Sequence, residues 1–154
     1  MKTVRLGKVT QGILLAFVTA AILAVTLLLQ GRPGVRTNLA PFEDLQRLSA
    51  LAARRGTLSN VVLFAAVGIA GNLAMFAVWA FLGWKFLDGK GRTPLRNSVD
   101  VLLAGILFSV GIEAVQLFLP TRAADINDIF WNVLGTLAGV LLAHAGTFVR
   151  FEWD

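Results

Sequence analysis

The chain has 154 residues, of which 56% are hydrophobic and only 15% are charged. A water-soluble domain usually carries about a quarter charged residues, so this composition excludes an ordinary globular protein and indicates a chain that folds in lipid. The net charge is +5, but the Lys and Arg residues lie almost entirely between the apolar segments. That placement indicates contacts with membrane lipids and not with nucleic acid. No cysteine is present, which excludes disulfides and thiolate metal sites.

Four apolar segments predict four membrane-spanning helices. Each is close to the roughly 17–25 residues that cross the hydrocarbon as a helix, and none alternates as a barrel strand would. Basic residues before the first segment resemble the start of a signal peptide, but its length and the lack of a small-residue cleavage site predict a retained anchor. We therefore expect an all-α polytopic bundle forming a single domain over residues 1–154. The predicted spans are residues 13–29, 61–83, 101–119 and 129–149.

The long connection between the first two spans contains a further predicted helix over residues 43–55. Leucines recur on one side of it at helical spacing (Leu45, Leu48 and Leu51), and charged residues lie elsewhere. This amphipathic pattern predicts a short helix lying in the membrane interface.

The basic residues also predict an orientation. With four spans, the two termini and the second connection share one side and hold eight Lys and Arg, whereas the other side holds six. Charges close to span ends in short loops weigh most in the positive-inside rule. We therefore expect both termini in the cytoplasm.

Most polar residues within or beside the spans are expected at one face of the membrane. The third span runs toward that face, so its polar residues lie near its end, and the fourth span begins there. Reversing the orientation moves the whole set to the opposite face without scattering it. The candidate ligand-binding pocket consists of Asn38, Asn72, Glu113, Gln116, Arg122, Asp125, Asp128 and Asn132.

Spacing indicates which of these residues share a helix face. Ser109, Glu113 and Gln116 are four and three residues apart, which places them on one side of the third span. On the fourth span, a polar face that starts at Asp125 continues into Gly135-x-x-x-Gly139. Such paired small residues let a neighbouring helix approach closely.

Glu113 makes the largest energetic demand, because a charged side chain at the centre of a span costs about 2.5–3.5 kcal/mol on insertion scales. It is expected to face the bundle interior, where Arg122 is the nearest cation in sequence and a candidate partner. One interpretation is a structural hydrogen-bond network that joins the helices. Another is a ligand site, with Arg122 suited to a phosphate or carboxylate.

The acidic residues admit two interpretations as well. Glu113, Asp125 and Asp128 together are hard oxygen ligands that suit Mg²⁺, but their spacing is no diagnostic metal signature, and we predict no metal site and no cofactor. The structural alternative makes Asp125 the N-cap of the fourth span and Asp128 a favourable charge in its first turn.

From about residue 37 to residue 143 the chain resembles the VanZ-like integral membrane proteins. Two matching blocks are Asn38-Leu39-x-Pro41-Phe42 and Asn72-x-x-x-Phe76, although the second lacks the Pro and Gly that usually follow it in the family. The most specific block is Glu113-x-x-Gln116, followed by Arg122-x-x-Asp125-x-x-Asp128-x-x-x-Asn132-x-x-Gly135-x-x-x-Gly139.

The resemblance implies a helical bundle in the bacterial cytoplasmic membrane. The founding member of the family is linked to low-level resistance to the glycopeptide antibiotic teicoplanin. We therefore expect a cell-envelope protein whose outer polar pocket binds an anionic headgroup, with a lipid-linked cell-wall precursor or a glycopeptide as candidate partner. The alternatives are a membrane enzyme acting on a lipid-linked phosphate and a small transporter that uses Glu113 as a proton carrier. With only four spans, the transporter would need to be a homo-oligomer.

Overall fold

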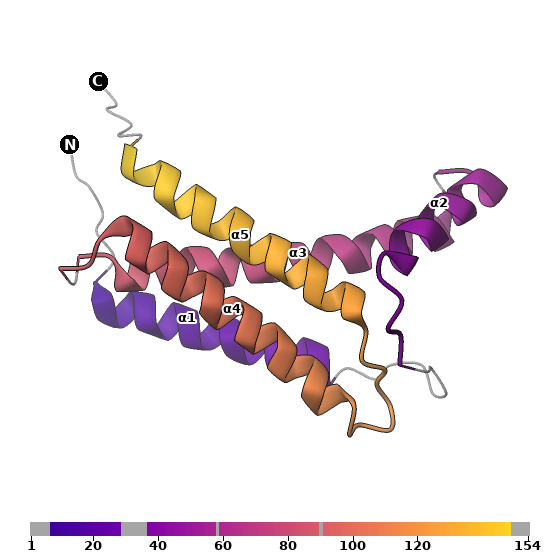
Figure 1. Ribbon diagram of the computed structural model, residues 1–154, viewed down its shortest axis with the longest axis horizontal. Coiled ribbons are helices and arrows are strands. Elements are labelled where there is room, and N and C mark those ends of the chain that lie inside the picture. The colour runs from indigo at the N-terminus through magenta and orange to yellow at the C-terminus, as the bar shows by residue number, and fades with distance from the viewer. Residues whose placement is uncertain (1–6, 29–36, 58, 90, 149–154) are drawn as a thin grey trace.

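Figure 1 shows a computed structural model of the chain, which describes residues 7–28, 37–57, 59–89 and 91–148. Within these ranges, four helices are long and apolar enough to cross a membrane, and no strand is formed beyond one isolated bridge. The predicted all-α polytopic fold is therefore confirmed. The helices are α1 (Lys8–Leu23), which continues as the π-helix η1 (Ala24–Leu28), α2 (Glu43–Arg55), α3 (Asn60–Leu87), α4 (Pro94–Gln116) and α5 (Ile126–Phe148).

The bundle has two chemically different ends. The start of α1, the end of α5 and the α3–α4 connection lie together at the left of Figure 1. Lys8 ties this end together, because its Nζ donates hydrogen bonds to the carbonyls of Lys85, Phe86 and Asp88 at the end of α3. At the opposite end lie α2, the connection over residues 117–125 and the start of α5. We call this second region the polar end.

Helix α2 matches the predicted amphipathic helix at both of its limits. The other helices begin or end up to seven residues from the predicted limits. Most continue beyond the apolar segment, whereas α4 ends at Gln116, three residues before the predicted limit at residue 119. Helix α4 begins at Pro94 instead of residue 101, because the Thr93 hydroxyl caps it by accepting a 3.3 Å hydrogen bond from the Arg96 amide. The predicted span limits at residues 29 and 149 lie outside the described residues.

Close contact between α3 and α5 forms the centre of the fold. A Cβ added to Gly135 would collide with the Leu73 carbonyl, and one added to Gly139 would collide with the Ala77 carbonyl. Both glycines are therefore required for the two backbones to touch, as the Gly-x-x-x-Gly spacing predicts. This contact brings the first turns of α5 beside the middle of α3, where Asn72 lies.

Candidate functional site

The residue at the centre of the polar end is Asp125, which immediately precedes α5. Its amide donates a 2.7 Å hydrogen bond to Oε2 of Glu113 on α4. Its carboxylate Oδ1 accepts from the Asn127 amide at 2.9 Å, which is the bond expected of a helix N-cap. Asp125 therefore fulfils the structural role predicted for it and also connects α5 to α4.

Asn38 joins the first connection to the same point. Its backbone forms a parallel bridge with Asp125, in which the Asn38 amide donates to the Ala124 carbonyl at 2.9 Å and the Ile126 amide donates to the Asn38 carbonyl at 3.1 Å. The Asn38 side chain adds a 3.2 Å bond from Nδ2 to Oδ2 of Asp125. The segment before α2 is thereby anchored to the start of α5.

Asn127 has a role that the sequence-based reasoning missed. It is only 2% exposed, and its Oδ1 accepts a 2.6 Å bond from the Phe42 amide while its Nδ2 donates to the Ala40 carbonyl and to Asp125. Phe42 adopts a left-handed backbone conformation (φ 60°) and packs its ring edge-on against Phe130. A bulky residue rarely takes this conformation unless its surroundings impose it, and the Asn127 and Phe130 contacts do so.

The two predicted helix asparagines make cross-helix bonds. Asn72 on α3 donates from Nδ2 to Oδ1 of Asp128 at 2.7 Å. Asn132 on α5 donates from Nδ2 to the Ser109 hydroxyl on α4 at 3.0 Å. Together with the Glu113–Asp125 bond, these contacts place the start of α5 between α3 and α4.

Gln116 and Arg122 both bond to η1, and the described residues form no ion pair between Arg122 and Glu113, although Arg122 still acts electrostatically on the Glu113 carboxyl. Gln116 donates to the Thr26 carbonyl at 2.9 Å, and Arg122 donates to the Val25 carbonyl at 2.6 Å. Both carbonyls belong to η1 (Ala24–Leu28), and carbonyls near the end of a helix commonly accept hydrogen bonds from outside it. Arg122 thus joins the connection after α4 to η1.

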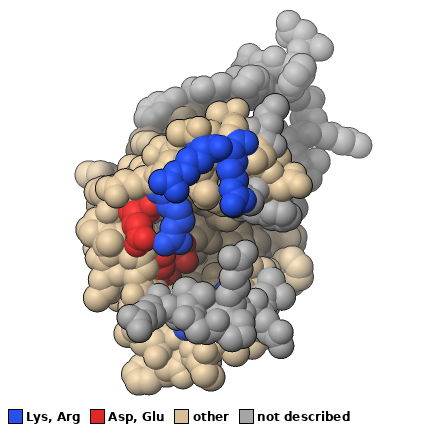
Figure 2. All heavy atoms as spheres, turned by 90° about the vertical axis from the view of Figure 1, so that its right-hand side faces the viewer, with Lys and Arg blue, Asp and Glu red and all other residues tan. Residues whose placement is uncertain are grey.

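A polar groove opens between α2, α3 and α5. Its volume is about 390 Å³, within the range of about 300–1,000 Å³ typical of small-molecule sites. Figure 2, which looks onto the polar end, shows basic side chains beside acidic ones at a hollow in the surface. The groove is lined by Arg47, Leu48, Ala65, Gly68, Ile69, Asn72, Asp125 and Asp128.

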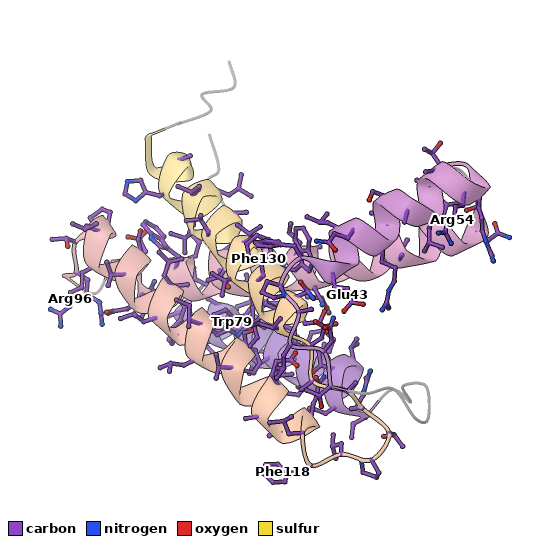
Figure 3. All side chains as sticks on the ribbon, turned by 45° about the vertical axis from the view of Figure 1, so that its right-hand side comes forward. Glu43, Arg54, Trp79, Arg96, Phe118 and Phe130 are labelled. Carbon is purple, nitrogen blue, oxygen red and sulfur yellow. The ribbon has the colours of Figure 1, made fainter. Side chains whose placement is uncertain are left out.

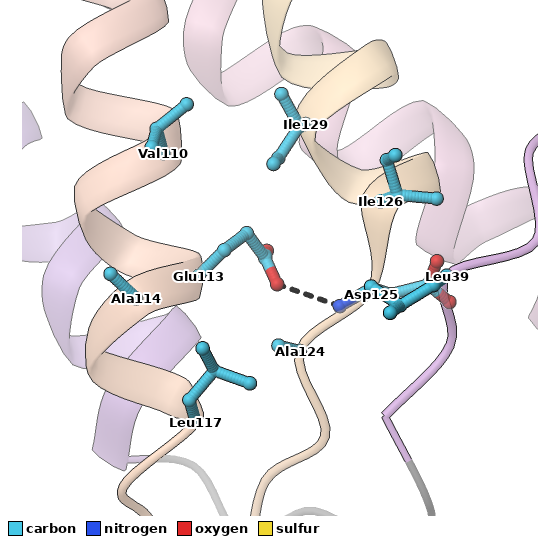
Figure 4. A pocket seen from close by; sticks show the side chains of 9 residues that line it. All are labelled: Leu39, Val110, Glu113, Ala114, Leu117, Ala124, Asp125, Ile126 and Ile129. Atoms are coloured by element: carbon cyan, nitrogen blue, oxygen red, sulfur yellow. Dashed lines mark hydrogen bonds between the residues drawn. The ribbon is translucent and has the colours of Figure 1, made fainter.

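A second, smaller cavity lies between α4 and α5 and is almost entirely apolar. We call it the slot. Its volume is about 240 Å³, and Figure 4 shows the Glu113 side chain crossing it from α4 toward the Asp125 amide. Asp125 lines both the slot and the groove. The slot is lined by Leu39, Val110, Glu113, Ala114, Leu117, Ala124, Asp125, Ile126 and Ile129.

The structure thus brings the predicted residues to one end but divides them among different contacts. Glu113, Asn38 and Asp125 form one group, and Asn72 and Asp128 line the groove together with Asp125. Asn132 and Gln116 each join two helices, and Arg122 joins the connection after α4 to η1. In the described ranges no three His, Cys, Asp or Glu side chains converge as metal ligands. The suggested Mg²⁺ site at Glu113, Asp125 and Asp128 is therefore not formed by these residues.

One comparison with known proteins, that with family models, finds a match. No curated protein and no solved structure matches the chain. The family model described as VanZ/LLP1 matches residues 12–149, a range that contains all eight predicted pocket residues as well as Asn127. The match covers nearly the whole chain, and four helices suit a membrane. The chain is therefore a multi-pass membrane protein that belongs to the VanZ/LLP1 family.

Proposed function

We propose that this protein acts in the bacterial cytoplasmic membrane as a binding protein for the anionic headgroup of a lipid-linked molecule. In this proposal both termini are cytoplasmic, and the polar end faces outward. The headgroup enters the groove between α2, α3 and α5. A lipid-linked cell-wall precursor is the proposed partner, and the proposed phenotype is a change in glycopeptide tolerance, as for the founding member of the family.

The observation that carries this proposal is the mixed charge of the groove. Arg47 on α2 lines one side, and Asn72 with Asp128 lines the other. A guanidinium suits a phosphate because it presents two parallel N–H donors. The carboxylates across the groove suit the hydroxyl or amide donors that a sugar- or peptide-bearing headgroup carries beyond its phosphate.

Arg47 is available for this role at little cost. It forms a 2.7 Å ion pair with Glu43 one turn earlier, but the two side chains are 65% and 37% exposed. Such an exposed pair contributes only about 0.3–0.5 kcal/mol. A phosphate in the groove can therefore take over the Arg47 guanidinium without a large loss.

Binding can be tested with protein in phosphatidylcholine nanodiscs that contain a small fraction of phosphatidylglycerol, a lipid with an anionic headgroup. Native mass spectrometry should show phosphatidylglycerol retained by the wild type and about tenfold less by Arg47→Ala, since one charge-assisted contact is lost. Arg54→Ala is the matched control, because Arg54 lies toward the far end of α2 in Figure 3 and does not line the groove. Equal retention by the two variants would refute the proposal.

The proposed phenotype can be tested in cells with teicoplanin. Expression of the wild type in a susceptible Gram-positive host should raise the teicoplanin concentration that stops growth, and Arg47→Ala should remove this effect while Arg54→Ala keeps it. Tolerance that is unchanged by the wild type would rule out the resistance role. On the described residues, no contact favours the lipid-phosphate enzyme or the Glu113 carrier over headgroup binding.

A further inference from the structure

The slot between α4 and α5 presents a second feature that headgroup binding in the groove does not use. Glu113 is only 6% exposed, and Oε2 of its carboxyl accepts the Asp125 amide. Among the described residues, no hydrogen bond reaches its other oxygen, Oε1. A carboxyl oxygen in apolar surroundings is stabilised by a hydrogen-bond donor.

The residues that line the slot indicate that such a donor comes from the membrane. Val110 on α4 and Leu117 directly after it line the slot and are 45% and 60% exposed. In a membrane-spanning helix such side chains face hydrocarbon, so the slot is continuous with the lipid-facing surface. Its volume of about 240 Å³ lies below that of typical drug-sized sites. It suits a segment of one hydrocarbon chain, not a whole headgroup.

We propose that the slot binds a single-chain membrane amphiphile whose polar end, an ammonium or hydroxyl group, donates a hydrogen bond to Oε1 of Glu113. The chain lies between α4 and α5 against the apolar walls. This site is distinct from the groove, because Asp125 separates the two cavities and the Arg47 side of the groove contributes nothing to the slot.

The geometry defines the head group that is accepted. Oε2 is already occupied by the Asp125 amide, so the remaining carboxyl oxygen can satisfy one donor. While the Glu113 carboxyl is ionised, Oε1 can only accept hydrogen bonds, so an amphiphile whose head also only accepts them, such as a methyl ester, gains nothing at this point. The site should therefore distinguish amphiphiles whose head groups donate hydrogen bonds from those whose head groups only accept them. A purely hydrophobic crevice would bind both kinds equally well.

The test uses full-length protein in phosphatidylcholine nanodiscs and a photoactivatable diazirine-bearing dodecylamine. Labelling should fall in the tryptic peptides 97–122 and 123–150, which carry the two walls of the slot. Unlabelled dodecylamine and dodecanol should compete, and which of the two competes better tells an ammonium from a hydroxyl. Methyl dodecanoate should compete about tenfold less well, the change expected when one hydrogen bond to a carboxyl group is lost.

Two variants with a matched control complete the test. Ala114→Phe fills the slot from α4 and should remove most of the labelling, whereas Ala104→Phe adds the same ring at an exposed position of α4 that does not line the slot. Glu113→Gln keeps an acceptor for the Asp125 amide but turns a donor toward the slot, so it should reverse the preference and favour methyl dodecanoate.

Equal labelling of Ala114→Phe and Ala104→Phe would overturn the proposal, and so would equal competition by all three chains in the wild type. Arg47→Ala should leave labelling unchanged. If phosphatidylglycerol is not retained but the slot is labelled normally, only the groove proposal fails. If phosphatidylglycerol is retained but the slot is not labelled, only the slot proposal fails.

Discussion

The Glu113 carboxyl and the Asp125 amide meet at 2.7 Å, so the acidic residue buried in α4 is bonded to the backbone that begins α5. This bond helps to explain why a carboxyl that forms no ion pair among the described residues is tolerated in a membrane-spanning helix. A helix start has amide groups with no helical partner, and they favour an acidic group. Glu113 is thus both a structural link and the polar group of the slot.

Replacing Glu113 by Ala should destabilise the bundle by about 1–3 kcal/mol, because the partly buried Asp125 amide loses its acceptor. Glu113→Gln should recover most of this loss, since its amide oxygen can accept the same bond. Thermal unfolding in detergent, followed by circular dichroism, measures the difference. Equal stability of the two variants would show that the bond contributes little.

Gly135→Ala and Gly139→Ala should each cost about 1–3 kcal/mol or more, because the added methyl meets the backbone of α3 and neither helix can move without losing its packing. Gly111→Ala is the control. No atom lies within 4 Å of a Cβ at Gly111, and its stability should stay within about 1 kcal/mol of the wild type. A Gly139→Ala protein as stable as Gly111→Ala would contradict the observed close approach.

Arg122→Ala should loosen the end of η1 and leave headgroup binding intact. The Val25 carbonyl loses its donor, so amide exchange should become faster over residues 22–28 by hydrogen–deuterium exchange mass spectrometry. Phosphatidylglycerol retention should match that of the wild type, because Arg122 does not line the groove. Loss of retention with unchanged exchange would instead make Arg122 the headgroup-binding residue.

The proposed orientation can be measured with single cysteines, because the chain has none of its own. Ser49→Cys, at an exposed position of α2, should react with a membrane-impermeant maleimide in intact cells. Leu95→Cys, at the start of α4 where Leu95 is 71% exposed, should react only after the cells are opened. The opposite pattern would reverse the orientation and place the groove in the cytoplasm.

The sequence by itself determined the four membrane helices, the amphipathic helix over residues 43–55 and the gathering of polar residues at one end. These features depend on local information, namely the length of apolar segments, helical spacing and the order of elements along the chain. The close contact at Gly135 and Gly139 was also predictable, because small residues four apart are a local pattern.

Only the tertiary structure decided which polar groups form hydrogen bonds with each other. Arg122 is nine residues from Glu113 in the chain, yet it bonds the Val25 carbonyl of η1, because the turn after α4 directs it toward that helix. Asn127 looks like a surface residue in the sequence and becomes buried only when the segment before α2 folds onto it. Hydrogen-bond partners depend on distances between elements far apart in the chain, and helix packing sets those distances.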